Sequence, residues 1–195
     1  NQDCIYDPRV SGLGTMEFEQ VVSPRGPTSA SGGSATYLPG QKREKLIRLT
    51  ERMGAGPSAI ERVFQGQSLN VGRLTRYSED WFSLFSSLGI CNRYQINRFY
   101  NPPLIRDLFS AVTGLELDER DMMRRAAAGW ELYRELNARE GLGTDADIFP
   151  GAWLNEQQVW GRGGRLRDYL GRDLGSQDLE CLLKAYYDER TREPG

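Results

Sequence analysis

The stretch Trp81-Phe82-Ser83-Leu84-Phe85-Ser86-Ser87-Leu88-Gly89-Ile90-Cys91 decides the fold class of this chain. Its large apolar side chains recur at helical spacing, which is typical of a helix packed in a core. Glycine is common just after the last helical turn, so Gly89 stands where such a helix should end. The stretch therefore predicts a core helix that closes beside a cysteine.

Helical spacing recurs on both sides of this stretch, with glycine, proline and aspartate at the expected ends. Strand-like alternation is scarce, and no internal repeat occurs. We therefore predict an all-α fold, an irregular multi-helix domain with long loops. Apart from the opening stretch, the expected helices lie around residues 46–53, 57–64, 102–113, 119–136 and 179–187.

The first 40 residues differ from the rest in composition. They are rich in Gly, Pro and Ser and show no sustained period, as in Ser31-Gly32-Gly33-Ser34. A segment of this kind has little core of its own, so it either docks on another surface or moves freely. We predict a loop-rich segment over 1–40, at an interface to domains that this chain lacks, and a helical domain over 41–195. The absence of an initiator Met fits a fragment, a processed chain or a trimmed one.

Composition excludes several classes of protein. The chain of 195 residues has a net charge of −2, which gives no indication of a nucleic-acid or membrane-surface partner. Its apolar runs are too short to span a bilayer. The start is neither basic nor apolar, unlike a signal peptide. Three widely separated cysteines favour a reducing cytoplasm over a disulfide framework.

The chain contains no histidine, which limits the chemistry that its own side chains can perform. Ser-His and Cys-His nucleophile pairs, imidazole bases and His-ligated zinc are all excluded. Reactivity must therefore rest on carboxylates, Tyr, Arg, Lys, Cys or a bound group. The sequence assigns no catalytic residue.

Cys91 has two interpretations. A single cysteine after an aromatic-rich helix is usually a small core residue. A thiolate at a helix end can also ligate a metal cluster, but a [4Fe–4S] cluster usually takes four cysteines. Because the chain has only three, far apart, it could donate one ligand to a site completed by other sequence.

Five segments, in order, resemble the tungsten-containing aldehyde:ferredoxin oxidoreductase family over almost the whole chain. They are Tyr6-Asp7-Pro8-Arg9 followed by glycines; Ser23-Pro24-Arg25-Gly26; Ser86–Cys91, which aligns with the family's DxxGLC; Asn137–Gly141 with the acidic loop Asp145–Pro150; and Leu183, Tyr186, Tyr187 and Arg190.

The resemblance implies a site shared with an N-terminal sandwich and a middle helical domain, both absent here. A tungsten (or molybdenum) bis-pterin and a [4Fe–4S] cluster would lie at the junction. Cys91 would supply the fourth cluster ligand, and Ser86, Leu88, Gly89 and Ile90 would approach a pterin. The family oxidises aldehydes to carboxylates and passes electrons to ferredoxin, and some relatives act on aromatic acyl thioesters or sugar phosphates. The isolated chain would be inert and hold no cofactor. Partners would be the N-terminal domains and ferredoxin or another electron-transfer protein, and a homodimer is left open.

Two departures from the family pattern oppose this interpretation. The family's pterin-contacting Asp is Ser86 here, which hydrogen-bonds without charge assistance. The family's His after the Arg-Gly loop falls near Ser29, so proton transfer by that residue is unavailable. The alternative is a degenerate, non-catalytic helical assembly or docking module of the same fold. For a domain with missing neighbours we also expect an exposed apolar patch near Cys91.

Overall fold

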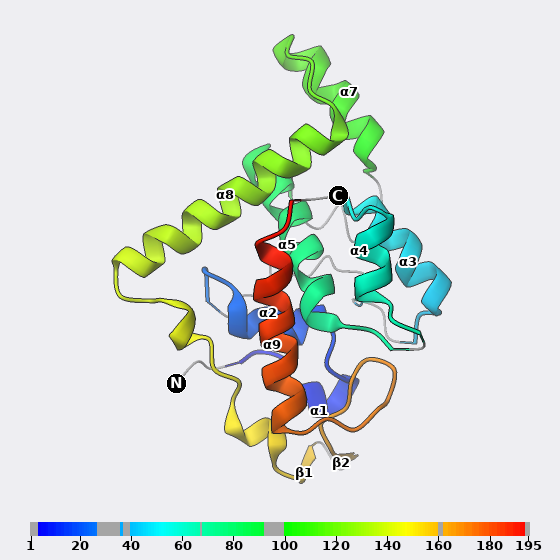
Figure 1. Cartoon of the computed structure of the whole chain (residues 1–195), viewed down its shortest axis with the longest axis vertical. Coiled ribbons are helices and arrows are strands. Elements are labelled where there is room, and N and C mark those ends of the chain that lie inside the picture. The colour runs from blue at the N-terminus through cyan, green and yellow to red at the C-terminus, as the bar shows by residue number, and fades with distance from the viewer. Residues whose placement is uncertain are drawn as a thin grey trace.

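The computed structural model describes residues 4–26, 36, 40–66, 68–91, 100–159 and 162–193. Helices dominate this part of the chain, and the expected all-α fold is confirmed (Figure 1). One short antiparallel hairpin adds to them, with Gln157 opposite Gly164. The elements are α1 (Pro8–Ser11), α2 (Thr15–Val22), α3 (Arg43–Arg52), α4 (Pro57–Val63), α5 (Val71–Ser87), α7 (Pro102–Thr113), α8 (Glu119–Arg139), α9 (Ser176–Arg190), the short 3₁₀ turns η1 (Thr144–Ala146) and η2 (Gly151–Leu154), and the strands β1 (Gln157–Val159) and β2 (Arg162–Gly164).

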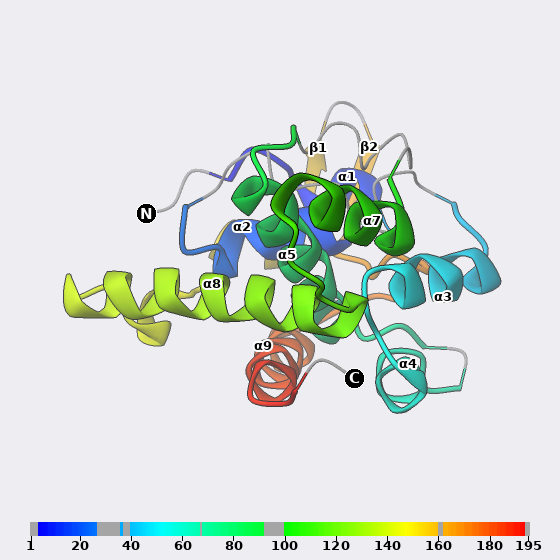
Figure 2. The ribbon, with the colours of Figure 1, turned by 90° about the horizontal axis from the view of Figure 1, so that it is seen from above.

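Helix α5 is the centre of the molecule. It packs against α2, α8 and α9 and also touches α3 and α4, while α7 projects from the body beyond the start of α8 (Figures 1 and 2). A Cβ atom on Gly72 would lie 2.2 Å from the Leu182 carbonyl oxygen. The close approach of α5 and α9 therefore requires glycine at this position.

Backbone hydrogen bonds end α5 where the sequence indicated. The Ile90 N–H donates to the Phe85 carbonyl at 2.9 Å, and the Gly89 N–H donates to the Ser86 carbonyl at 3.2 Å. Gly89 has φ +68°, so these bonds form the left-handed glycine stop that often follows a helix. The chain consequently leaves the helix just before Cys91.

Two apolar cores flank α5. The first gathers side chains of α3, α4, α5, α7 and α8, and the second joins the N-terminal segment and α9 to α5. Both cores include residues of α5, which makes it the shared wall. The first contains Leu46, Met53, Ala55, Ala59, Val63, Phe64, Leu69, Leu74, Tyr77, Trp81, Leu84, Phe85, Ile105, Met122, Met123 and Ala126, and the second contains Leu13, Phe18, Val21, Val22, Val71, Trp153, Leu166, Leu174, Leu179, Leu182 and Tyr186.

Within the segment 1–40, which the sequence predicts as loop-rich, Pro8–Ser11 and Thr15–Val22 are helical. Asp7 caps α1 by accepting a hydrogen bond from the Arg9 N–H at 2.9 Å, and α2 lies deep in the second core. Helix α2 was not predicted because tertiary packing buries even its polar residues Glu19 and Gln20, so its sequence lacks an amphipathic period. Residues 27–35 and 37–39 lie outside the described part. The interface to other domains stays a prediction.

Buried ion pairs fasten α9 to α5. Arg190 pairs with Glu79 and Asp80 at 2.6 Å each and stacks over the ring of Trp130, 5.4 Å from its centroid. The preceding residue, Glu189, accepts from the Arg62 and Arg73 side chains on α4 and α5. Breaking such a pair in the interior strands a charge away from water, so the last turn of α9 fixes the position of α5.

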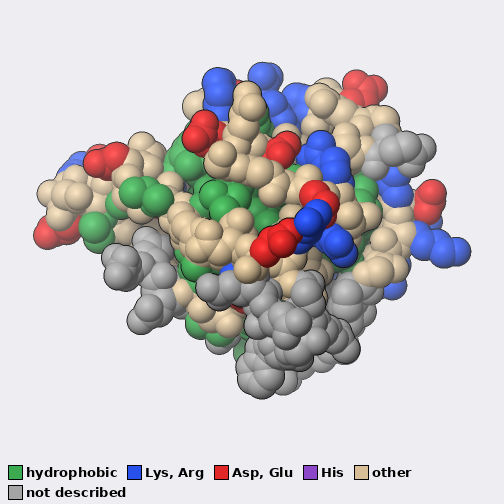
Figure 3. Space-filling view, turned by 90° about the horizontal axis from the view of Figure 1, so that it is seen from below, with side chains coloured by type: hydrophobic (Ala, Val, Ile, Leu, Met, Phe, Trp, Pro, Cys, Tyr) green, Lys and Arg blue, Asp and Glu red, His purple; other side chains and the backbone are tan. Residues whose placement is uncertain are grey.

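Charged side chains of both signs are interspersed on the described surface, as the view from below shows (Figure 3). Among the described residues, none of the helices has both the length and the apolar character needed to cross a bilayer.

Candidate functional site

The predicted site segment borders a surface hollow of about 450 Å³ between α5, α8 and the loop after α2. This hollow brings together two segments that the sequence analysis quoted separately, because Arg25 of the Ser-Pro-Arg-Gly loop lies in its wall beside Ser86. Its lining residues are Arg25, Phe82, Ser83, Ser86, Ser87, Gly129, Trp130 and Tyr133.

The α5–α8 contact forms the floor of the hollow. The Ser83 hydroxyl donates to the Ala126 carbonyl at 2.8 Å and so joins the two helices. Phe82 and Trp130 are 2% and 6% exposed, so both are held firmly by the core. Gly129 faces Ser83 with ordinary contact distances, which keeps this wall of α8 close to α5.

The other predicted site residues follow Ser86 along the end of α5. Leu88 and Ile90 are half-buried against the first core, which anchors the turn. Gly89 is exposed, and a Cβ there would meet nothing within 4 Å. Cys91 is exposed as well. The interpretation of Cys91 as a small core residue is therefore wrong, and its thiol is accessible from outside.

Apolar side chains are exposed along the second half of α8. Leu132, Tyr133 and Leu136 are 56%, 45% and 50% exposed. Tyr133 lines the same hollow as Ser86, whereas Leu132 lines the larger hollow described below, so the apolar patch expected near Cys91 stays a prediction. Surface of this type is common where another domain docks.

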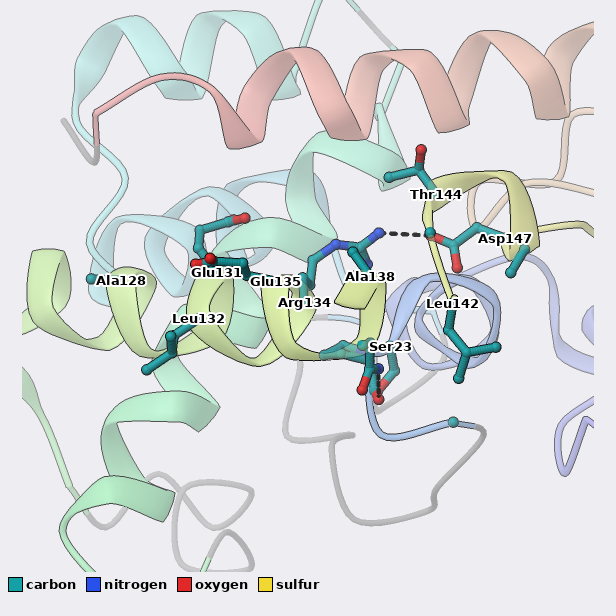
Figure 4. Close-up of a pocket in the computed structure, with 15 residues that line it drawn as sticks. Ser23, Ala128, Glu131, Leu132, Arg134, Glu135, Ala138, Leu142, Thr144 and Asp147 are labelled. Atoms are coloured by element: carbon teal, nitrogen blue, oxygen red, sulfur yellow. Dashed lines mark hydrogen bonds and ion pairs between the residues drawn. The ribbon is translucent and has the colours of Figure 1, made fainter. Parts of the chain in front are cut away.

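A second hollow, of about 760 Å³, lies between α8, the loop after α2 and the loop after α8 (Figure 4). Arg134 of α8 reaches across it, pairs with Asp147 at 3.0 Å and donates to the Val22 carbonyl. The Asn137 amide donates to the Pro24 carbonyl. These bonds tie the loops after α2 and α8 to the helix, which is a structural role.

The Arg134 side chain is largely buried, with 14% of its surface exposed. Burial lowers the pKa of Arg134, but the neighbouring Tyr186, Tyr187 and Asp147 outweigh burial, so the net shift of its pKa is upward. Burial and a hydrogen bond to Asp147 both raise the pKa of the Tyr187 hydroxyl. Arg139, by contrast, pairs on the surface with Glu135, which lies one helical turn before it.

The two arginine-bearing turns have different surroundings. Arg9 is bound on all sides, since it pairs with Asp7 and donates to the Ala152 carbonyl at 2.7 Å. Arg9 therefore stabilises a turn and is not available to a ligand. Arg25 is exposed, and its guanidinium forms no ion pair with any described residue. Arg25 is thus the arginine that remains available to a ligand.

The donor set limits what the site can hold. No group of three or more His, Cys, Asp or Glu side chains arranged for a metal occurs in the described ranges. Cys91 is exposed at the end of α5, Cys181 is exposed on α9, and Cys4 is half-buried near the start. The described residues therefore do not form a complete four-cysteine site for a [4Fe–4S] cluster, and a cysteine among them fits such a cluster only as a single ligand.

Comparison with known proteins identifies the family. A family model described as "Aldehyde ferredoxin oxidoreductase, domains 2 & 3" matches residues 4–192. The chain belongs to this family, and the resemblance inferred from the five segments is confirmed. Neither the curated proteins nor the solved structures contain a match. The family places the chain in an oxidoreductase context and within a multi-domain architecture.

Proposed function

We propose that this chain forms one wall of a pterin and iron–sulfur site that oxidises an aldehyde to a carboxylate and passes the electrons to ferredoxin. Family membership supports the general reaction type. The observation that carries the finer assignment is the exposure of Cys91 immediately after the glycine stop of α5. A cluster held by other parts of the protein can reach this thiol.

The turn before Cys91 suits contact with a flat cofactor. Gly89 leaves open space where any other residue would place a side chain, so a ring can approach its backbone closely. The Ser86 hydroxyl is exposed and makes no hydrogen bond to a described residue, so it is free to bond a pterin. Ser86, Leu88, Gly89 and Ile90 are the residues that we assign to the pterin, and Cys91 is the assigned metal ligand.

When bound, a tungsten (or molybdenum) bis-pterin supplies two-electron oxidation and the cluster carries the electrons away. The role of this chain's own residues is to position and shield. The half-buried Leu88 and Ile90 anchor the turn, and the aromatic side chains of α8 limit access of water. With no histidine in the chain, a proton must move through another group or another chain segment.

Metal analysis of the protein, expressed from its complete gene under anaerobic conditions, tests the proposal. We expect iron and tungsten or molybdenum in the purified protein, and a [4Fe–4S] spectroscopic signature that Cys91→Ser weakens or abolishes. Cys181→Ser is the matched control, because it removes another exposed cysteine, on α9. Protein that lacks iron, or a cluster that survives Cys91→Ser unchanged, would refute the assignment.

The second candidate is a non-catalytic assembly or docking module of the same fold. It is favoured by Ser86 in the position of the family's aspartate and by the absence of histidine. Exposed apolar residues on α8, such as Leu132 and Leu136, suit a docking role equally well. A protein that assembles with its neighbouring domains but contains neither metal nor pterin would support this candidate over the first.

A further inference from the structure

Glu79 is fully buried at the contact between α5 and α9, and the proposed function makes no use of it. One of its oxygens, Oε2, accepts hydrogen bonds from the Tyr186 hydroxyl at 2.7 Å and from the Arg190 guanidinium at 2.6 Å. The other oxygen, Oε1, is also buried and has no donor among the described residues. An ionised carboxylate with an unbonded oxygen is costly in the interior, so this environment favours the protonated, neutral acid.

Glu189 of α9 shows what stabilises an ionised carboxylate at the same contact. Both of its oxygens accept hydrogen bonds, from the Arg62 and Arg73 guanidiniums at 2.6 Å each and from the Tyr77 hydroxyl at 2.7 Å. Burial alone would raise the pKa of Glu189, but these donors outweigh burial and lower the pKa to about 2. Among the described residues, Glu79 has a single guanidinium partner and a bare oxygen, so it lacks the donors that keep Glu189 ionised.

The guanidinium that Glu79 contacts is shared with other acids. Arg190 also pairs with Asp80 at 2.6 Å and faces Glu131 at 3.4 Å, so three carboxyl groups surround one cation. Asp80 has a second guanidinium, that of Arg76, at 3.2 Å. When two carboxyl groups share a site, the charge on one disfavours the charge on the other. Because Asp80 has the additional cation, a shared proton is expected on Glu79.

The net effect of these surroundings is to raise the pKa of Glu79. Burial raises the pKa most and the charge of Asp80 raises it further, whereas Arg190 and the Tyr186 hydroxyl lower it, so that it moves from 4.5 to about 7. The groups that act most strongly on Glu79 thus belong to α5 and α9. The other helices packed against α5 contribute Glu131 and Arg134 (α8), which act on Arg190 and Tyr186, Arg62 (α4), which binds Glu189, the buried Glu19 (α2), and the uncharged Leu46 and Thr50 (α3).

We infer that Glu79 binds a proton on Oε1 in the folded protein close to neutral pH and that this proton latches α9 to α5. With the proton in place, Oε2 still accepts from Tyr186 and Arg190. Release of the proton leaves two neighbouring carboxylates on one guanidinium, which weakens the hold on the last turn of α9. Because the pKa of Glu79 is raised, the stability that this group contributes is complete below about pH 4.5 and is lost as the pH rises through about 7. The latch requires neither metal nor pterin, so it goes beyond the proposed function.

An NMR titration of the protein labelled with ¹³C-glutamate tests the protonation directly, because the carboxyl chemical shift follows ionisation. We expect the Glu79 carboxyl, assigned by through-bond correlation, to titrate with a midpoint of about 7. The Glu189 carboxyl should stay ionised between about pH 4.5 and 7. A Glu79 midpoint more than about one unit above 4.5 supports the inference, and a lower midpoint overturns it. The titration uses the wild-type protein, so it does not depend on the folding of any variant.

Glu79→Gln tests the latch, because glutamine has the shape of the protonated acid and cannot ionise. The ratio of the wild-type unfolding constant to that of Glu79→Gln should rise between about pH 4.5 and 7, by up to about tenfold per pH unit. Hydrogen exchange of the last turn of α9, measured by mass spectrometry, should become faster in the wild type than in Glu79→Gln over the same range. A ratio that does not change with pH would overturn the latch.

Glu180→Gln is the matched control, because it removes a carboxylate from an exposed position on the same helix, α9. Both the unfolding constant and the hydrogen exchange of this variant should keep the wild-type dependence on pH. If Glu180→Gln flattened that dependence as much as Glu79→Gln, the general charge of α9 would be responsible and the proposal would fail.

Discussion

Gly89 adopts a backbone conformation that side chains resist, and this makes it a test of the turn before Cys91. Its φ of +68° is left-handed, while a Cβ there would meet no atom within 4 Å. Gly89→Ala should therefore lower the free energy of unfolding by about 1–2 kcal/mol, entirely through the backbone. Gly151→Ala, at an equally open position without positive φ, should stay within about 0.5 kcal/mol of wild type in urea unfolding. Equal costs at both positions would contradict this reading of the turn.

Single residues differ in how far the sequence predicts their environment. The glycine stop of α5 and the aspartate cap of α8 follow from local rules, and the structure has both. At the start of α8, the Asp118 carboxylate accepts a hydrogen bond from the Asp121 N–H at 2.7 Å. The exposure of Cys91 does not follow from local rules, because it depends on which helices lie nearby. The proximity of Arg25 to Ser86 was also beyond prediction, since it requires the packing of α2 against α5.

The contact between α5 and α9 depends on a small residue. A Cβ on Gly72 would lie 2.2 Å from the Leu182 carbonyl, so one helix must move in Gly72→Ala. We expect Gly72→Ala to lower the free energy of unfolding, measured with urea, by about 3 kcal/mol, which is the upper range for overpacked cores. Gly129→Ala on α8 is the matched control, because its Cβ would lie 3.5 Å from the Ser83 hydroxyl, an ordinary contact. The free energy of unfolding of this control should rise by up to about 1 kcal/mol, because alanine has a higher helix propensity than glycine. If Gly72→Ala left the free energy of unfolding unchanged, α5 and α9 would have to lie farther apart than described.

The last turn of α9 should make stability depend on acid pH. Burial would raise the pKa of Glu189, but hydrogen bonds from Arg62, Tyr77 and Arg73 outweigh burial and lower it from 4.5 to about 2. A lowered carboxyl pKa contributes stability that is complete above the unfolded value and is lost as pH falls from about 4.5 to about 2. The contribution is at most about 3 kcal/mol.

Glu189→Gln should remove this contribution at neutral pH and flatten the fall in stability between about pH 4.5 and 2. Its neighbour Asp188 is the control, because it forms an exposed pair with Lys184 and such pairs contribute little. Asp188→Asn should follow the wild-type curve in urea unfolding measured against pH. If the free energy of unfolding of Glu189→Gln fell with pH as steeply as that of the wild type, this would argue against the buried network around Glu189.

Helices marked by glycine, proline or a run of large apolar residues could be predicted from the sequence, and α2 could not. The ends of α3, α4, α7 and α9 fall close to the predicted positions because glycine, proline and a clear period mark them. Helix α2 lacks this pattern, because Glu17, Glu19 and Gln20 are buried along with its apolar residues. The hairpin of β1 and β2 is too short to show an alternating pattern.

At the scale of the whole molecule, α5 should make the two cores unfold together. Val71 at its start belongs to the second core and Phe85 near its end belongs to the first. Phe18 is buried in the second core against Phe149 and Tyr186, so Phe18→Ala should cost about 3–5 kcal/mol. If the cores are one cooperative unit, that loss must also appear in helices that Phe18 does not touch.

Native-state hydrogen exchange of Phe18→Ala distinguishes the two cases. In one cooperative unit, buried amides of α3, such as those of Leu46 and Thr50, lose as much protection as those of α9 around Leu182. Leu170→Ala, at a position 45% exposed, should leave the hydrogen-exchange protection of both helices near the wild-type values. Loss of protection confined to α9 would mean that the cores unfold separately. In that case the N-terminal segment and α9 would be a subdomain that α5 holds only loosely, and the hollow between α2, α5 and α8 would open with it.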